Sequence, residues 1–402
     1  MASSFDELNK QACPEGVPRV PLGSVGTFTR GSGLQKADLQ NEGFPAIHYG
    51  QIHTIYHHAI DSTCKFVSED KADGFKKAQT GDIVLATTSE DDEAVGKAVA
   101  WLGDGEVAVS GDAVIYSHKL DPAYVSYFFE CSDFQYEKLR YISGAKVRRI
   151  SPKSLEKILI PHPPLEVQQE IVRILDLFVD LDRELEQEII GREKQFVSTR
   201  DALLDSLDYP TEKFGDKTTV ARGASPRPIR NFITNDPEGI PWIKIGDVPE
   251  GDKYITQTAQ KVTQAGADKS RMVYPGDFML SNSMSFGRPY ITRIEGAIHD
   301  GWLSISNFEE TWTSDFLYHV LSSEISQRQF RMLVGSGAVS NLNAKVVQKT
   351  EIPVPPLEVQ EEIASKLDTF IEYIDNLKRE RELRQKQYAH YRDLLLDLPV
   401  KE

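Results

Sequence analysis

The sequence has few cysteines, no long apolar run and no excess of positive charge. Its 402 residues include three cysteines, Cys13, Cys64 and Cys131, which are scattered without a Cys-x-x-Cys pair. An odd and dispersed set argues against a disulfide framework and against a structural zinc site. We recognise no signal peptide and no run of about 18 apolar residues, so we expect a cytoplasmic protein without a membrane span.

The formal net charge of −15 argues at first against nucleic acid, because Lys and Arg contacts to phosphate supply much of the affinity for DNA. The negative charge is unevenly placed, however. Residues 158–214 carry 13 acidic and 6 basic side chains, whereas residues 140–157 include six Lys and Arg residues. The rest of the chain is therefore less acidic than the total indicates.

Motifs of catalysis are missing as well. The Pro-Pro pairs at 163–164 and 355–356 do not belong to the Asp/Asn/Ser-Pro-Pro-aromatic tetrapeptide of amino-methyltransferases. The sequence has no P-loop, and its Gly-Ser-Gly triplets at 31–33 and 335–337 lack the third glycine of a dinucleotide site. We interpret both triplets as turns.

Two groups of polar residues have side chains of the kinds found in metal or nuclease sites. His48, His53, His57 and His58 lie in a segment that reads as strand and loop, without the helical spacing of zinc ligands, so we expect no metal site. Asp61 followed by Glu69-Asp70-Lys71 weakly resembles a nuclease triad. Such spacing arises by chance in a chain with 61 acidic residues, which favours a solvated loop.

One stretch occurs twice. IPHPPLEVQQEIVRILDLF begins at Ile160, and IPVPPLEVQEEIASKLDTF begins at Ile352. The prolines keep the chain extended until they are passed. Apolar residues spaced three and four apart then predict a helix of about 40 residues, or about 60 Å, in each copy. Each helix needs a partner for its apolar stripe, so we expect an antiparallel coiled coil that acts as a spacer, with core residues Ile171, Phe178, Leu185, Ile363, Phe370 and Leu377.

Globular segments precede both helices. Residues 1–155 have the short apolar runs and frequent glycines of strands and loops, with a helical segment around Pro122–Tyr141, and residues 209–350 repeat that plan loosely. We expect an α+β protein with two α/β domains, 1–155 and 209–350, and two helical spacers, 156–208 and 351–402. The helices match each other better than the domains do. This contrast indicates one scaffold used twice by two readers of different targets.

With these motifs, nearly the whole chain resembles the specificity subunits of type I restriction-modification systems. The resemblance is carried by the paired Pro-Pro-Leu-Glu-Val-Gln helix starts, by RGASPRPIRNFITNDPEGIPWIKIGDV at 222–248 and by VYPGDFMLSNSMSFGRPYI at 273–291. It implies that each domain is a target recognition domain for a few base pairs of double-stranded DNA. The helices would hold the domains apart, so that the target is split and asymmetric, with a fixed gap.

The resemblance also implies partners. Two methyltransferase subunits would modify adenine with S-adenosylmethionine, two motor-nuclease subunits would join them, and the acidic helices would be docking surfaces. This chain would bind no cofactor or metal and carry no catalytic residue. The alternatives are a coiled-coil adaptor whose domains bind protein, or a decoy that sequesters methyltransferase subunits.

Polar and basic loop residues are the candidates for DNA contact, because such side chains contact base edges and phosphates. In the second domain they are Arg222, Ser225, Arg227, Lys244, Asn282, Ser283, Ser285 and Arg288, and in the first Arg30, Lys36, Thr87, Thr88, Ser89, Lys146, Arg148 and Arg149. For the last three we favour phosphate contact. Alternatively, Arg222 and Arg227 solvate a loop, and Asn282 and Ser283 cap a turn. Trp101, Trp242, Trp302 and Trp312 are expected to be core.

Overall fold

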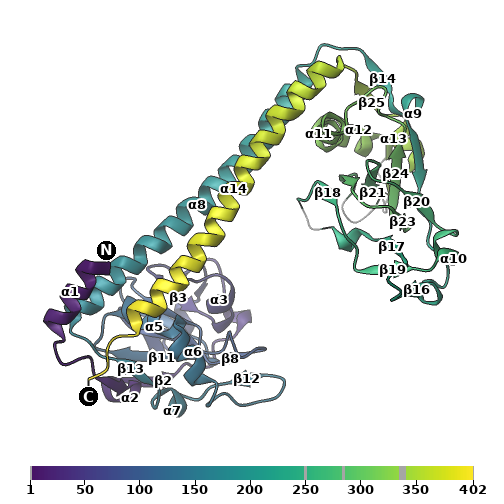
Figure 1. Cartoon of the computed structure of the whole chain (residues 1–402). Coiled ribbons are helices and arrows are strands. Elements are labelled where there is room, and N and C mark those ends of the chain that lie inside the picture. The colour runs from purple at the N-terminus through teal and green to yellow at the C-terminus, as the bar shows by residue number, and fades with distance from the viewer. Residues whose placement is uncertain (1, 249–250, 283–285, 335–340, 402) are drawn as a thin grey trace. The chain divides into compact units, whose positions relative to one another are not determined.

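The computed structural model describes residues 2–248, 251–282, 286–334 and 341–401. The chain divides into two compact units, one of residues 1–186 and 379–402 and the other of residues 187–378. Each unit combines one globular domain with one part of each long helix (Figure 1). Within the described ranges, no helix is long and apolar enough to cross a membrane.

The first domain is built on two main sheets. The five-stranded sheet has the order β2 (Gly26–Arg30), β11 (Ala113–His118), β7 (Ile83–Ala86), β9 (Ala98–Trp101) and β4 (Ala59–Ile60). The four-stranded sheet has the order β5 (Phe66–Val67), β3 (Phe44–Ile47), β10 (Val107–Val109) and β6 (Lys77–Ala78). Two short pairs are β1 (Arg19–Pro21) with β13 (Leu159–Pro161), and β8 (Thr88–Ser89) with β12 (Arg148–Arg149).

The second domain has the same plan. One five-stranded sheet has the order β15 (Thr219–Arg222), β24 (Trp302–Ser306), β21 (Phe278–Ser281), β22 (Pro289–Thr292) and β18 (Tyr254–Ile255). The other has the order β16 (Ile233–Thr234), β19 (Gln260–Val262), β17 (Ile240–Ile243), β23 (Gly296–Ile298) and β20 (Arg271–Val273). β14 (Thr211–Lys213) pairs with β25 (Glu351–Pro353).

Short helices surround these sheets. In the first unit they are α1 (Ala2–Ala12), α2 (Leu22–Val25), α3 (Tyr49–Thr54), α4 (Glu69–Ala72), α5 (Pro122–Glu130), α6 (Ser132–Lys138), α7 (Pro152–Leu155) and the 3₁₀ turn η1 (Lys36–Asp38). In the second they are α9 (Phe214–Lys217), α10 (Gln264–Ala267), α11 (Ser314–Ser322), α12 (Glu324–Val334), α13 (Ala344–Gln348) and the 3₁₀ turns η2 (Ile229–Asn231) and η3 (Ile245–Asp247).

The central strand of each main sheet separates two apolar clusters. Successive strand residues point to opposite faces, so Ile83 and Leu85 of β7 pack with α5, while Val84 and Ala86 join a second cluster around Trp101. In β21, Phe278 and Leu280 pack with α11, and Met279 joins Trp302 on the other face. All four tryptophans are buried, at 0–3% exposure, which confirms the expectation that they are core residues.

The two long helices are α8 (Leu165–Asp205) and α14 (Leu357–Leu396), of 41 and 40 residues. Each starts after a Pro-Pro pair and uses the glutamine of the repeated motif to attach itself to its domain. The Gln168 amide donates to the Pro163 carbonyl at 2.8 Å and accepts from the Asp121 N–H at the start of α5 at 2.9 Å. Gln360 makes the same contacts with Pro355 and Thr313, at 2.8 Å each. Both glutamines are buried, and a buried amide needs hydrogen-bond partners. These hydrogen bonds explain why both copies of the motif have glutamine at this position.

Helices α8 and α14 pair antiparallel within each unit. In the first unit the rings of Phe178 and Tyr391 stack with centroids 5.4 Å apart, and Arg381 binds Asp182 through two hydrogen bonds of 2.9 and 3.0 Å. In the second unit Phe196 and Phe370 meet edge to face at 5.7 Å, and Lys378 binds Glu193 at 2.8 Å. Low-numbered residues of α8 thus meet high-numbered residues of α14, which confirms the expected antiparallel arrangement.

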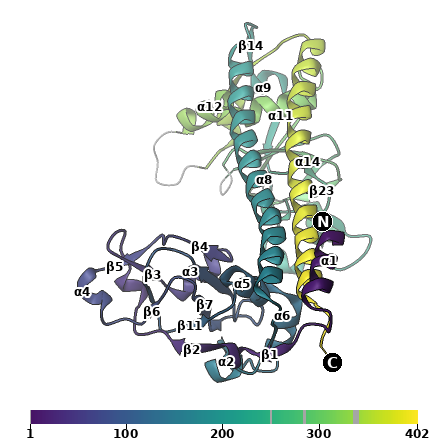
Figure 2. The same ribbon diagram turned by 90° about the vertical axis from the view of Figure 1, so that its left-hand side faces the viewer.

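Some apolar residues of the two long helices pack into the cores of the domains. Ile171 lies in the core cluster of the first domain with Tyr124 and Phe128 of α5, and Figure 2 shows α5 beside the foot of α8. Ile363 lies in the core of the second domain. Phe178 and Phe370 make the helix–helix contacts described above, and Leu185 and Leu377 are half-buried. The helix ends are therefore parts of the domain cores, which the spacing of apolar residues alone did not indicate.

A polar cluster joins each domain to its long helix. In the first unit, the Tyr127 hydroxyl donates to Asp176 of α8 and contacts the His58 ring at 3.1 Å. In the second unit, the Lys253 ammonium lies 3.0 Å from both Asp368 carboxylate oxygens, and His319 contacts Asp368 at 2.8 Å. The two clusters occupy corresponding places in the repeat. Their compositions differ, because the second contains a partly buried ion pair.

Candidate nucleic-acid interface

In the second domain, several predicted contact residues converge on the turn His299–Gly301. This turn connects β23 of one five-stranded sheet to β24 of the other, so it lies where the two sheets meet. Ser225 and Arg227 come from the segment that follows β15, and Asn282 follows β21. The strands therefore bring together side chains that are far apart in the sequence.

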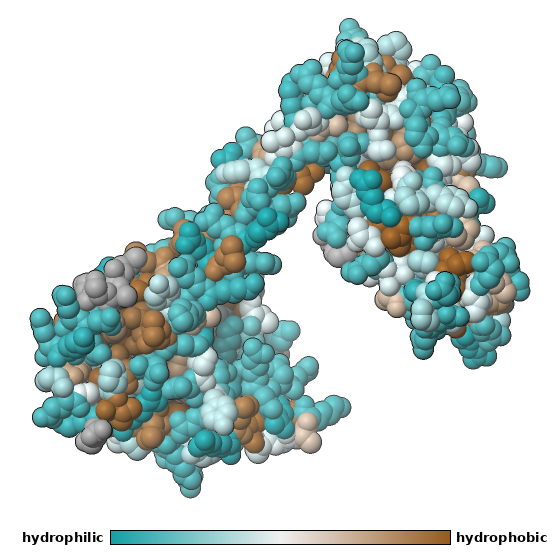
Figure 3. Space-filling view, viewed as in Figure 1, coloured by the Kyte–Doolittle hydropathy of each residue, from teal (hydrophilic) through white to brown (hydrophobic). Residues whose placement is uncertain are grey.

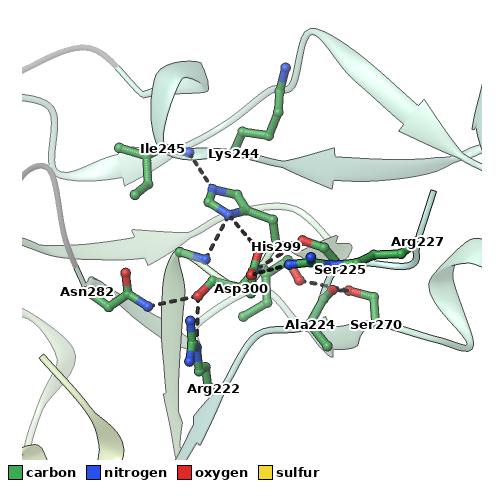
Figure 4. A network of polar contacts seen from close by, with 12 residues as sticks. Arg222, Ala224, Ser225, Arg227, Lys244, Ile245, Ser270, Asn282, His299 and Asp300 are labelled. Carbon is green, nitrogen blue, oxygen red and sulfur yellow. Dashed lines mark hydrogen bonds and ion pairs between the residues drawn. The ribbon is translucent and has the colours of Figure 1, made fainter. Parts of the chain in front are cut away.

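Asp300 is the centre of this network (Figure 4). Its carboxylate accepts a hydrogen bond of 2.7 Å from the Ser225 hydroxyl and lies 3.6 Å from the Arg227 guanidinium. Its backbone carbonyl accepts from Arg222 Nε at 3.0 Å and from the Asn282 amide at 2.8 Å. The hydrogen bond from Ser225 is the main cause that lowers the pKa of Asp300. The carboxylate is therefore ionised at neutral pH.

His299 supports the turn from behind. The Gly301 N–H points at Nδ1 at 2.8 Å, and the Ile245 N–H points at Nε2 at 3.2 Å. Burial lowers the pKa of His299 although Asp300 is nearby, and two N–H groups aimed at the ring also favour its neutral form. A Cβ at Gly301 would lie 2.1 Å from the imidazole, so the ring can fold back only because residue 301 is glycine.

Of the other four predicted residues of the second domain, two lie at the rim of this network and two outside the described residues. Lys244 is half-buried, and its ammonium lies 3.0 Å from the Gln260 side chain. Arg288 is half-buried beside β21, where its backbone N–H donates to the Ser281 hydroxyl at 3.2 Å. Ser283 and Ser285 fall outside the described residues. Asn282 is 4% exposed and Arg227 is 83% exposed at its side chain, so these two candidates differ strongly in access to a ligand.

The first domain contains the same turn with different side chains. Strand pairing places Arg30 opposite Val114 and Arg222 opposite Leu303, so that Gly111 corresponds to Asp300. The main-chain contacts agree, because Arg30 Nε donates to the Gly111 carbonyl at 3.0 Å, as Arg222 does to Asp300. Ser110 takes the place of His299 and accepts from the Tyr49 N–H at 2.9 Å. The carboxylate comes one residue later, at Asp112, and lies 4.0 Å from the Arg30 guanidinium.

A hollow of about 550 Å³ opens at this turn of the first domain. Backbone pairing aligns Gly33 with Ser225, because Ser32 and Ala224 donate to corresponding carbonyls of β10 and β23. The serine and aspartate of the second domain are thus both replaced by glycine in the first. Other residues of its wall are Arg30, Lys36, His48, Tyr49 and Asp112. The positive side chains Arg30 and Lys36 are both exposed there, in a form suited to a negatively charged or hydrogen-bonding ligand.

The comparisons with known proteins decide the family. The family model described as "Type I restriction modification DNA specificity domain" matches residues 14–192 and 215–385. The chain belongs to this family. Its role is accordingly DNA sequence specificity, and specificity subunits are the non-catalytic members of type I systems.

Relatives of the family cover most of the chain. The specificity subunit of the type I restriction enzyme EcoR124I/EcoR124II of Escherichia coli is 31% identical over 63% of this chain and 66% of its own length. A putative type I restriction enzyme specificity subunit of Haemophilus influenzae is 29% identical over 76% of this chain and 77% of its own length.

Solved structures of the family show the same fold. One, a chain of a type I R-M system, superposes with a TM-score of 0.67 at 19% identity and covers 95% of this chain and 97% of that chain. The HsdS subunit from Thermoanaerobacter tengcongensis gives a TM-score of 0.53 at 19% identity, over 96% of both chains. At this identity the likeness concerns the fold alone.

The other predicted residues of the first domain of this specificity protein lie on the pair β8–β12 and beside it. Lys146 and Arg149 are exposed, and Arg148 is bound by Asp92 and by the Gly144 carbonyl. Ser89 is half-buried in β8, whereas Thr87 and Thr88 are buried, at 8% and 9% exposure. The Thr87 hydroxyl donates to the Asp112 carbonyl at 3.0 Å. Direct DNA contact by any of these residues stays a prediction.

The sequence patterns mispredicted two short segments and did not reveal two residues. Glu69-Asp70-Lys71, expected in a solvated loop, belongs to α4. The segment after His48 is not strand and loop throughout, since residues 49–54 form α3 and His53 belongs to it. Among the described residues, no three His, Cys, Asp or Glu side chains lie close enough to hold a metal ion. The sequence did not single out Asp300 or His299. The sequence signal that could have indicated them is the His-Asp-Gly triplet next to a strand, but such a triplet is too short and too common to predict a site.

Proposed function

We propose that each domain recognises one part of a divided double-stranded DNA target, and that α8 and α14 set the gap between the two parts. The observation that carries this proposal is the turn built twice, with equal main-chain contacts and different side chains. A scaffold preserved in this way provides the same place for a ligand, and the exchange of Ser225 and Asp300 for Gly33 and Gly111 changes what it selects.

Exposure separates the candidates for DNA contact. Arg222 and Arg227 in the second domain, and Arg30, Lys36, Lys146 and Arg149 in the first, are exposed and positively charged. These residues are suited to contact phosphate or the acceptor edge of a base. Buried Thr87, Thr88 and Asn282 would act through the backbone that they hold in place.

The proposal includes partner subunits. Two methyltransferase subunits would use S-adenosylmethionine to modify adenine, and two motor-nuclease subunits would complete the restriction enzyme. The helices are suited to docking because large apolar side chains remain exposed on them, and Figure 3 shows hydrophobic patches among hydrophilic residues there. They include Leu177 (49%), Ile190 (39%), Tyr373 (45%), Leu383 (59%) and Leu394 (54%). Exposed apolar residues rimmed by charge are typical of interaction surfaces.

A footprint tests the proposal. The chain is purified together with the methyltransferase subunit of its host, and bound sequences are selected from a library of random duplexes at about 0.15 M salt. We expect protection of two short segments with an unprotected gap of constant length. Binding without any preference over random duplex would refute sequence recognition and would favour an adaptor or a decoy. One continuous protected segment would refute the division of labour.

A further inference from the structure

Asp300 is an unexpected residue at a surface that we propose to face DNA. Its side chain is 41% exposed and lies among the positively charged candidates. A carboxylate at this place repels phosphate, since like charges at short range raise the free energy of binding. A carboxylate at position 300 therefore needs another role that favours binding and offsets this repulsion.

The contacts of Asp300 supply that contribution. The Ser225 hydroxyl donates to its carboxylate, and the Asp300 N–H donates back to the same hydroxyl at 3.3 Å, so residues 225 and 300 hold each other in place. The second carboxylate oxygen faces Arg227 at 3.6 Å. This ion pair favours one orientation of the Arg227 guanidinium and so partly restrains a side chain that is otherwise exposed. An arginine restrained in this way loses less side-chain entropy when it binds a base edge.

We propose that Asp300 is a positioning residue that sets the base preference of the second domain by orienting Arg227 toward a guanine of its half-site. Guanine is the base of choice for a guanidinium, because its O6 and N7 acceptors match two parallel N–H donors. The inference rests on the proposed function, since it names the residue through which one of the two domains discriminates. Asp300 acts on Arg227 and does not itself touch the base.

The first domain shows what the turn is like without this device. Gly33 and Gly111 stand there in place of Ser225 and Asp300. A Cβ built on Gly33 would have no atom within 4 Å, and the open space belongs to the hollow of about 550 Å³. The carboxylate of Asp112 faces Arg30, which is anchored on the turn itself. The two domains thus differ at the same two positions, which is where a change of specificity is expected.

The test compares D300N with D112N in the full chain bound to its methyltransferase partner. Each variant removes one negative charge from the corresponding turn of one domain. We measure affinity for the selected target, for every single-base substitution of it and for random duplex. In D300N we expect the preference for guanine at one position of the second half-site to fall about tenfold or more, while preference in the first half-site stays at the wild-type level and affinity for random duplex rises.

D112N is expected to raise affinity for random duplex as well and to leave the second half-site at its wild-type preference. S225A should weaken the guanine preference in the same direction as D300N, because the hydroxyl no longer fixes the carboxylate. R227A should abolish it. Equal thermal unfolding of D300N and wild type shows that the effect is not loss of the fold.

Three results would overturn the inference. Undiminished guanine preference in D300N would show that Asp300 does not position Arg227. Equal loss at both half-sites would show a general effect on the fold. A preference that switches from one base to another in D300N, with R227A unaffected, would show that Asp300 contacts the base itself. A wild-type complex without any sequence preference would refute the proposed function, which separates the two failures.

Discussion

The ion pair that joins the second domain to α14 should stabilise its unit measurably. Lys253 is 13% exposed at its side chain and His319 is fully buried, and both bind Asp368, which is 37% exposed. Burial by itself would lower the pKa of Lys253, but hydrogen bonds to Asp315 and Asp368 outweigh it and raise that pKa. D368N preserves the shape of the side chain and removes its charge.

The size of the effect follows from the geometry. Removing one partner of a fully buried ion pair costs about 3–5 kcal/mol. Here the cost is smaller, because Asp368 is partly solvated and Asp315 still lies 2.7 Å from the Lys253 ammonium. We therefore expect a loss of about 2 kcal/mol in the free energy of unfolding of the second unit. For a unit of this size, that loss corresponds to a decrease in Tm of about 4–8 °C.

D176N in the first unit is the matched control. It occupies the corresponding place in the repeat, but there the main partner is the neutral hydroxyl of Tyr127, so the expected cost is about 1 kcal/mol. Scanning calorimetry of the full chain measures both variants, each in the transition of its own unit. A decrease for D368N no larger than that for D176N would refute the argument that charge dominates the second cluster.

The pH dependence adds a second readout for D368N. Although burial acts against it, hydrogen bonds from His319 and Lys253 lower the pKa of Asp368. A carboxyl group whose pKa is lower in the folded state contributes stability above its unfolded pKa, near 3.9, and this contribution is lost as pH falls through the folded value. The difference between wild type and D368N should therefore disappear in strong acid. A difference that persists there would exclude the ion pair as its cause.

Three other perturbations have definite expected results. Burial lowers the pKa of His118 from 6.5 to about 4, so the first unit should lose about 2 kcal/mol of stability from this residue between pH 6.5 and pH 4.5. Urea unfolding of H118F at both pH values should show a smaller dependence of stability on pH. An unchanged dependence would exclude His118 as its source. R381M removes the bonds from α14 to Asp182 and Glu186 and should cost the first unit about 1 kcal/mol in low salt and less in 1 M salt; a loss independent of salt would indicate packing instead. Four residues inserted after Gly191, with four more inserted after Leu377 to match, lengthen the helix pair by about 6 Å and should widen the preferred DNA gap by one or two base pairs; an unchanged gap in the selected sequences would contradict the role of the helices as a ruler.

The long helices could be predicted from sequence because their signal is repeated and periodic. The Pro-Pro pairs fix where each helix begins, and the apolar spacing fixes which residues lie on one face. The function of Gln168 and Gln360 could not be predicted in this way. Their hydrogen bonds join the start of each long helix to the start of α5 or α11, at Asp121 and Thr313, which lie 47 positions earlier in the chain. Contacts of that range depend on the fold and leave no local pattern.

The sequence predicted some residues of the candidate site but not the residue at its centre. Arg222, Ser225, Arg227 and Asn282 were chosen one by one as polar loop residues, and the structure gathers them on one turn. Asp300 was not chosen, because a single carboxylate among 61 acidic residues has no distinguishing pattern. Thr87 is predicted as a first-domain analogue of the second-domain candidates, but it comes directly after a buried strand and its side chain bonds to Asp112. Side-chain type indicates which residues can contact DNA, and only the strand pairing shows which of them are accessible.

The most direct test of the account is a genome-wide map of methylated adenine in the host, with and without this chain. We predict that methylation dependent on the chain occurs at one sequence made of two short specific parts, separated by a gap of constant length. In D300N, the same map should show relaxed choice in one part only. Methylation that is unaffected by loss of the chain, or that follows one uninterrupted sequence, would contradict the claim that two dissimilar domains on a shared helical scaffold specify a divided target.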